Sequence, residues 1–215
     1  MLWLWIQSLS MFILDMVIDR LQTVGWLSLL LLVLGCSGCS RRIEQKQLHI
    51  SDMSFRGTVS FRWVDKNDWY TVDLYDSVSR RSDRIIIPYE IYDIQTGDIN
   101  GDGHTDICVG LIKPTPFDPV MRKRLFIFQI DEHYLKPLWL GSRLAYSFEQ
   151  FKVNETAAGC MVRTLEKGKA GKWSVSEYRW QNFGLAFVRR IADSVTYADA
   201  EKLLEIDKDR ETLTK

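Results

Sequence analysis

The sequence of 215 residues has few of the features by which enzymes are recognised. It lacks the G-x-S-x-G turn of serine hydrolases, the H-E-x-x-H motif, the P-loop and the dinucleotide-binding glycines. Histidine is scarce, and no histidine has a Cys, His or Glu partner at the spacing of a zinc site. The three histidines are His49, His104 and His133. None of these enzyme classes is indicated, and we expect a protein that is not an enzyme.

Carboxylates, by contrast, are abundant, with 28 aspartates and glutamates in the chain. A glycoside hydrolase needs only two of them, one as acid and one as base or nucleophile. The alternative to a non-enzyme is therefore a hydrolase acting on envelope glycans, although nothing in the sequence selects a pair. The residues considered for such a pair are Glu90, Asp93, Glu149 and Glu155.

The chain also has no excess of positive charge, because its 28 basic residues balance its 28 acidic residues. Binding to a phosphate backbone needs clustered Lys and Arg side chains. Here the two signs are interspersed, and the densest basic run, Arg122-Lys123-Arg124, leads into an apolar stretch, Leu125–Phe128, typical of a strand. We therefore expect no nucleic-acid partner.

Cysteine and proline are also few, with four and five residues. Cys108 and Cys160 lie in apolar runs, so we expect two buried thiols in preference to a disulfide, which an exported compartment would permit. Three prolines fall within residues 113–119. Because proline fixes φ and removes a backbone donor, this stretch predicts an ordered loop outside the sheets. It is either a contact site or a plain connection.

The N-terminus carries an apolar run, Trp26–Gly35, of the length of a signal-peptide core and short for a membrane span. Val33-Leu34-Gly35-Cys36 resembles a bacterial lipobox, in which the cysteine is lipidated and becomes the mature N-terminus. Cys39 is a second candidate. Several acyl chains together give stable anchoring, so we expect an exported protein of the bacterial cell envelope whose membrane partner is reached through the lipid.

Two alternatives concern the same region. The run could join residues 1–18 into a transmembrane anchor, although Asp15, Asp19 and Arg20 interrupt the apolar span. The first 15 residues are apolar where a signal peptide has a positive n-region, and a start at Met16 would give a short leader with one basic residue. Residues 1–15 are therefore a possible start-site error.

Beyond the leader, short alternating or β-branched runs bounded by turn residues predict a mainly β protein with antiparallel sheets. Near the C-terminus, Thr196 with Asp199 three residues later is typical of a helix start, followed by Ala200, Leu203 and Leu204 on one face. The expected organisation is a signal peptide at 1–35, a lipidated N-terminus and linker at 36–50, a β-rich domain at 51–195, and a helix with a tail at 196–215.

Residues 98–106, D-I-N-G-D-G-H-T-D, place short oxygen-bearing side chains at alternate positions around a turn. A single loop that supplies several oxygens while its backbone curls around an ion is a calcium loop, and Gly103 permits the reversal. The candidate ligands are the side chains of Asp98, Asn100, Asp102 and Asp106 and the backbone carbonyl of His104. The alternative is an acidic hairpin turn without metal.

The loop is not an EF-hand, because position twelve is Val109 and the flanks read as strands, not helices. Residues 96–110, T-G-D-I-N-G-D-G-H-T-D-I-C-V-G, resemble the FG-GAP/VCBS repeat of integrin-type β-propellers and secreted bacterial proteins. The resemblance implies a Ca²⁺ loop at the edge of a propeller blade. The sequence departs from the repeat in lacking its Phe-Gly and Gly-Ala-Pro segments, and we find one good copy of the loop.

The resemblance therefore implies a single embedded repeat or a partial, degenerate β-propeller-like fold. The function expected is that of a lipid-anchored binding or envelope-scaffold module with a structural calcium loop. Its ligand, whether protein or glycan, is not identified by the sequence.

Overall fold

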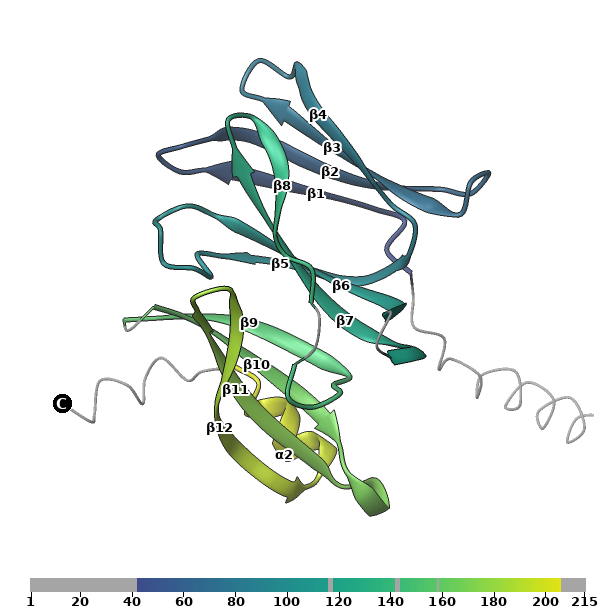
Figure 1. Ribbon diagram of the computed structural model, residues 1–215, viewed down its shortest axis with the longest axis vertical. Coiled ribbons are helices and arrows are strands. Elements are labelled where there is room, and N and C mark those ends of the chain that lie inside the picture. The colour runs from purple at the N-terminus through teal and green to yellow at the C-terminus, as the bar shows by residue number, and fades with distance from the viewer. Residues whose placement is uncertain (1–41, 116–117, 142–143, 158, 206–215) are drawn as a thin grey trace, which may run out of the picture. The chain divides into compact units, whose positions relative to one another are not determined.

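The computed structural model describes residues 42–115, 118–141, 144–157 and 159–205. They form three antiparallel sheets, each made of four strands that are consecutive in the chain (Figure 1). Sheet 1 contains β1 (Gln45–Ser51), β2 (Arg56–Val64), β3 (Trp69–Asp76) and β4 (Arg81–Ile87). Sheet 2 contains β5 (Glu90–Gly97), β6 (Asp106–Thr115), β7 (Asp118–Asp131) and β8 (Tyr134–Trp139). Sheet 3 contains β9 (Gln150–Thr156), β10 (Gly159–Lys167), β11 (Trp173–Gln181) and β12 (Gly184–Val195).

The expected fold class is confirmed: the protein is mainly β, with antiparallel sheets and one short C-terminal helix in the part of the chain described. Each sheet has the strand number and the up-and-down order of a propeller blade. Corresponding strands of neighbouring sheets contact each other. The first strands of sheets 2 and 3, β5 and β9, are in contact, as are the last strands of sheets 1 and 2, β4 and β8. Three such sheets are fewer than the roughly four to eight blades of a typical propeller.

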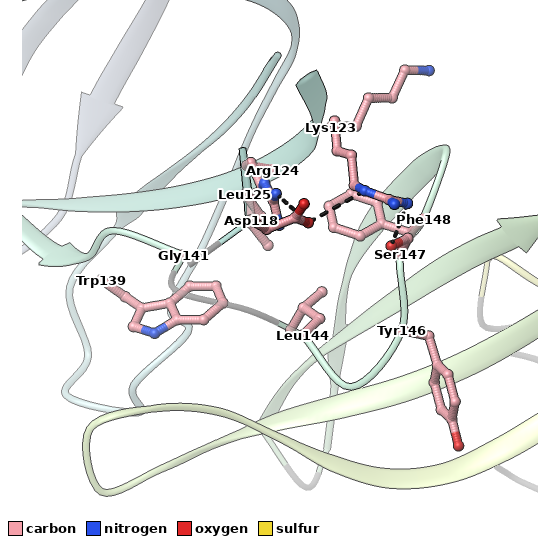
Figure 2. A pocket seen from close by; sticks show the side chains of 11 residues that line it. Asp118, Lys123, Arg124, Leu125, Trp139, Gly141, Leu144, Tyr146, Ser147 and Phe148 are labelled. Carbon is pink, nitrogen blue, oxygen red and sulfur yellow. Dashed lines mark hydrogen bonds and ion pairs between the residues drawn. The ribbon is translucent and has the colours of Figure 1, made fainter. Parts of the chain in front are cut away.

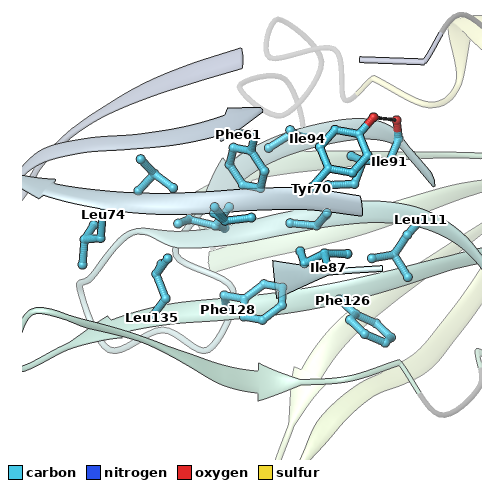
Figure 3. Close-up of a cluster of buried hydrophobic side chains, with 14 of the residues drawn as sticks. Phe61, Tyr70, Leu74, Ile87, Ile91, Ile94, Leu111, Phe126, Phe128 and Leu135 are labelled. Atoms are coloured by element: carbon cyan, nitrogen blue, oxygen red, sulfur yellow. Dashed lines mark hydrogen bonds between the residues drawn. The ribbon is translucent and has the colours of Figure 1, made fainter. Parts of the chain in front are cut away.

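Sheets 1 and 2 are held together by a core of side chains that alternate along their strands. Phe61 and Leu74 come from sheet 1, and Leu111 and Phe128 come from sheet 2 (Figure 3). Each of these residues is at most 8% exposed, and burial of such side chains contributes roughly 1.5–3 kcal/mol apiece. The hydroxyl of Tyr70, within this core, donates to the Ile43 carbonyl at 2.6 Å. Apolar side chains at every second position of the strands thus account for the packing of sheets 1 and 2.

Sheets 2 and 3 share a second core, to which β6 and β7 contribute the residues between those of the first. Gly110 allows the close approach, because a Cβ there would lie 2.6 Å from Tyr92 Cζ and 2.8 Å from Phe151 Cε1. The side-chain amide of Gln95 also joins the two sheets. It donates to the Phe151 carbonyl at 3.0 Å and accepts from the Val153 N–H at 2.9 Å, which links the edges of β5 and β9.

The other face of sheet 3 is covered by helix α2 (Tyr197–Lys202), whose Ala200 packs on Leu165 and Val175. As expected, Thr196 is the N-cap and its hydroxyl oxygen accepts from the Asp199 N–H at 3.2 Å. Beyond the helix, the Arg163 guanidinium donates to the Leu203 carbonyl at 2.9 Å, so the segment after α2 is fixed to the sheet by its own carbonyls. Between β10 and β11 lies a short 3₁₀ turn, η1 (Lys169–Gly171).

Two expectations are corrected by the strand positions. Strand β1 begins at Gln45, inside the range 36–50 assigned to a linker, because the edge strand alternates with only a few apolar residues. The described residues of the range 113–119 belong to the sheet and not to a loop outside it, since β6 runs to Thr115 and β7 starts at Asp118. Pro114 is accommodated where the β6–β7 register shifts, at a position that needs no ladder donor.

Cys108 and Cys160 are both free and buried, as expected. The predicted signal peptide, the lipidation residues Cys36 and Cys39, and the tail beyond Glu205 lie outside the described residues. Within the described ranges, no helix is long and apolar enough to cross a membrane.

Candidate metal centre

The predicted calcium loop joins β5 to β6, as the strand–loop–strand interpretation requires. Gly97 and Asp106 are paired across the antiparallel ladder, so the intervening residues close a hairpin. Gly101 and Gly103 have φ of 80° and 84°, a backbone region that side chains rarely adopt. The two glycines therefore let the chain turn back on itself between the acidic positions.

Asp98 organises the turn through three backbone hydrogen bonds. Its Oδ1 accepts from the N–H groups of Gly101 at 2.8 Å and Asp102 at 3.0 Å, and its Oδ2 accepts from Gly103 at 2.9 Å. Asn100 and Asp102 are joined by a hydrogen bond of 2.8 Å from Nδ2 to Oδ2. The loop is therefore already curled, with the carboxylate at its first position facing the N–H groups of its centre.

Asp106 is the unusual residue of the loop, because its side chain is fully buried. Oδ2 accepts from the Ile99 N–H at 2.9 Å, whereas Oδ1 is buried with no hydrogen-bond partner in the described residues. Desolvation, together with the negative charges of Asp102 and Asp98, raises the pKa of Asp106 to about 7. A buried carboxylate oxygen without a partner is costly, so the site favours either a proton or a cation at this atom.

A fourth carboxylate reaches the loop from sheet 1. Asp52, in the β1–β2 turn, accepts the Thr105 N–H at 2.9 Å through Oδ2, while its Oδ1 accepts the N–H groups of Ser54 and Phe55. Sequence analysis missed this residue, because Asp52 looks like an ordinary turn residue and its partner lies 53 positions away. Its contact fixes the backbone immediately before Asp106.

No basic side chain of the described residues forms an ion pair that compensates these charges. Across the described ranges, none of the four carboxylates, Asp52, Asp98, Asp102 and Asp106, takes part in an ion pair. Like charges this close in sequence and space repel one another. A bound cation is the simplest means of removing that repulsion.

The oxygen donors of the loop are of the kind that a hard cation prefers, but their side chains do not converge on one point. No three His, Cys, Asp or Glu side chains of the described chain converge as they would in a preformed metal site. The oxygens of Asp98 and Asp102 instead accept N–H groups. Asp98 Oδ1 accepts two, whereas Asp98 Oδ2 and both oxygens of Asp102 accept one each and keep a second lone pair. Asp106 Oδ1 accepts no hydrogen bond within the described part of the chain. His104 donates its N–H to Asp102 Oδ1 at 2.9 Å, and its Nδ1 is buried without a partner in the described residues.

The carboxylates considered for a hydrolase do not form an evident acid/base pair. Glu149 is 3.4 Å from Lys123 Nζ, which gives it a structural ion pair. Asp93 accepts from Gln95 Nε2 at 2.6 Å and lines an open cleft of about 540 Å³ beside α2. A second cavity, of about 80 Å³, has Asp118 as its carboxylate (Figure 2). Asp106 and Glu166, carboxyl groups whose pKa burial raises, border neither cavity.

Comparison of the chain with protein-family models and with curated proteins gave no match. The FG-GAP/VCBS resemblance therefore rests on the residues of the loop alone.

The buried Asp106 predicts a pH dependence of stability in calcium-free buffer. Its folded pKa of about 7 lies above the ordinary 3.8, so the folded state binds the extra proton between these values. The stability that this group contributes is full below the unfolded pKa of 3.8, falls as pH rises to the folded pKa of about 7, and is lost above it. Relative to Asp106→Asn, the wild type should lose roughly 2–4 kcal/mol between pH 4 and 8, as measured by urea unfolding. A pH-independent difference between the two proteins would contradict the buried carboxyl group.

The Asp52 contact predicts a local effect on the loop. Asp52→Ala should lower the free energy of unfolding by about 1–3 kcal/mol and speed hydrogen exchange at the Thr105 amide. Asp76→Ala is the matched control, because Asp76 accepts N–H groups from Val78 and Arg80 of its own turn but makes no contact with the loop. Unchanged Thr105 exchange in Asp52→Ala, by NMR or mass spectrometry, would show that the hydrogen bond does not hold the loop.

Proposed function

We propose that residues 98–106 bind one structural Ca²⁺ ion. The observation that carries the proposal is the buried Oδ1 of Asp106, which has no hydrogen-bond partner among the described residues and is subject to the negative charges of Asp102 and Asp98. Ca²⁺ takes oxygen ligands from carboxylates, amides and backbone carbonyls in a flexible geometry. Asp98, Asn100, Asp102 and Asp106 would hold the ion through side-chain oxygens, and His104 through its backbone carbonyl.

The ion would act on stability, because Asp106 is the first residue of β6. From Asp106 onward this strand contributes to both the first and the second core. A cation would supply positive charge to balance the four carboxylates. It would therefore stabilise the β5–β6 hairpin, including the whole of β6. The Asp52–Thr105 hydrogen bond would extend the same effect to the β1–β2 turn.

We further propose that the protein is an exported, lipid-anchored module of the bacterial cell envelope that binds a partner or serves as a scaffold. The lipobox-like residues before Cys36 support the anchor, and the blade-like sheets support a binding or scaffold role, since such sheets present loops on a rigid frame. The absence of an evident acid/base pair among the described carboxylates favours this role over hydrolysis.

Calcium should raise the melting temperature of the protein. Binding stabilises by RT ln(1 + [Ca²⁺]/Kd), so a site with Kd near 10⁻⁴ M gives about 1.4 kcal/mol at roughly 1 mM ion, a shift of a few degrees. The double variant Asp98→Ala, Asp102→Ala should lose this shift. Magnesium at equal concentration should shift the wild type much less, because it requires near-ideal octahedral geometry. If the wild type has the same melting temperature with and without calcium, the loop is an acidic turn that does not bind the ion.

The anchor predicts that membrane fractionation depends on Cys36. Cys36→Ala should move the protein to the soluble fraction, and globomycin, which blocks removal of lipoprotein signal peptides, should prevent maturation. Cys39→Ala is the matched control, and it should fractionate as the wild type does. Loss of fractionation in Cys39→Ala alone would assign the anchor to that residue, and retention in both variants would support the transmembrane alternative.

A further inference from the structure

A small polar cavity lies between β7, the end of β8 and the segment Leu144–Phe148 that leads to β9. Its volume is about 80 Å³. Figure 2 shows Asp118 and Arg124 on one side of the cavity and Trp139 and Leu144 on the other. The cavity therefore has one charged wall and one wall of ring and aliphatic carbon.

The charged wall belongs to a group of side chains with excess positive charge. Lys113 and Arg122 are direct cross-strand partners, an arrangement of like charges that destabilises a sheet. Lys113 Nζ lies over the ring of Tyr89 at 4.5 Å, and Lys123 is neutralised by Glu149. Lys113 keeps its charge, because it forms no ion pair in the described residues, and Arg122 and Arg124 share one carboxylate. Two guanidinium groups and one carboxylate together carry a net charge of +1.

That shared carboxylate is Asp118. Arg124 Nη2 donates to its Oδ2 at 2.8 Å, and Arg122 Nε is 3.2 Å from the same oxygen. The hydrogen bond from Arg124 lowers the pKa of Asp118, so the carboxyl group is ionised at neutral pH. The Arg124 side chain is only 8% exposed, which holds its guanidinium in place. Arg124 is thus held in place by burial, whereas Arg122, with a side chain 43% exposed, is positioned by its contacts with Asp118 and Ser147.

Both guanidinium groups have donors to spare. Arg122 Nη1 donates to Ser147 Oγ at 3.1 Å, and Arg124 Nε donates to the Lys113 carbonyl at 3.4 Å. In the described residues, no hydrogen bond occupies Arg122 Nη2 or Arg124 Nη1. Arginine binds carboxylate and phosphate oxygens with such planar sets of N–H groups.

We propose that this cavity binds an oxyanion, a phosphate or carboxylate group that is either free or carried by a larger ligand. The spare N–H groups of Arg122 and Arg124 would receive the anion, and its charge would balance the second guanidinium. If a larger ligand carries the group, the ring of Trp139 provides an apolar surface for its body. The site is separate from the calcium loop and does not depend on calcium binding. Under the proposed binding role, oxyanions would be the class of ligand that this protein binds.

The test is titration of the full chain, purified in detergent, with inorganic phosphate by isothermal calorimetry. The wild type should bind with a Kd on the order of 1 mM, and Arg122→Gln should weaken binding by about tenfold or more. Arg80→Gln is the matched control, because Arg80 pairs with Asp76 at the same i,i+4 spacing in another hairpin and is 82% exposed. It should bind phosphate as the wild type does.

Asp118→Asn provides a readout in the opposite direction. Removing its charge frees both guanidinium groups, so phosphate should bind more tightly although the protein melts at a lower temperature. Glucose 6-phosphate tests whether the anion belongs to a larger ligand. If it binds more tightly than phosphate and Trp139→Leu removes the difference, the site takes a phosphate group carried by a larger ligand. If the two affinities are equal, the site takes the free anion. The proposal is overturned if the wild type does not bind phosphate, if Arg122→Gln and Arg80→Gln weaken binding equally, or if Asp118→Asn fails to tighten it.

Discussion

Strand β6 is buried on both faces, and its first residue is an aspartate. Ile107, Val109 and Leu111 pack against sheet 1, whereas Cys108 faces sheet 3, so both cores require this strand to keep its register. A shift of one residue would exchange the two faces. The residue that fixes the start of the strand is Asp106, which is fully buried at the end of an acidic loop. Neutralising this carboxylate, by a proton or by a cation, would therefore stabilise the strand on which both cores depend.

The sheets are also joined by polar side chains that act on backbone groups. Asp52 holds the Thr105 N–H, Gln95 bridges β5 to β9, and Arg163 holds the carbonyls that follow α2. Arg163 is itself positioned by an ion pair of 2.9 Å with the buried Glu177. Each of these contacts satisfies donors or acceptors where regular hydrogen bonding ends, at a turn, an edge strand or a helix terminus. The Asp52 and Gln95 contacts link neighbouring sheets that share no ladder, and the Arg163 contact links the segment after α2 to sheet 3.

Features with local signals were predictable from the sequence. The glycine turn and alternate oxygens of residues 98–106 identified the loop, and Thr196 with Asp199 identified the start of α2. Strand β1 was missed because an edge strand with one solvent-facing side carries few apolar residues. The Asp52 contact and the cavity beside Asp118 depend on residues that only the tertiary fold brings together. Pro114 suggested a loop because the sequence does not show that its position lacks a ladder donor.

The central claim is that calcium neutralises the loop at Asp106, and its most direct test is equilibrium dialysis of the full chain in detergent against calcium. The account predicts about one ion per chain for the wild type, with a Kd on the order of 10⁻⁴–10⁻³ M, and loss of that ion in Asp106→Asn. Asp76→Asn, which alters a turn carboxylate outside the loop, should retain the ion. No bound calcium in the wild type, or equal binding by Asp106→Asn, would contradict the claim.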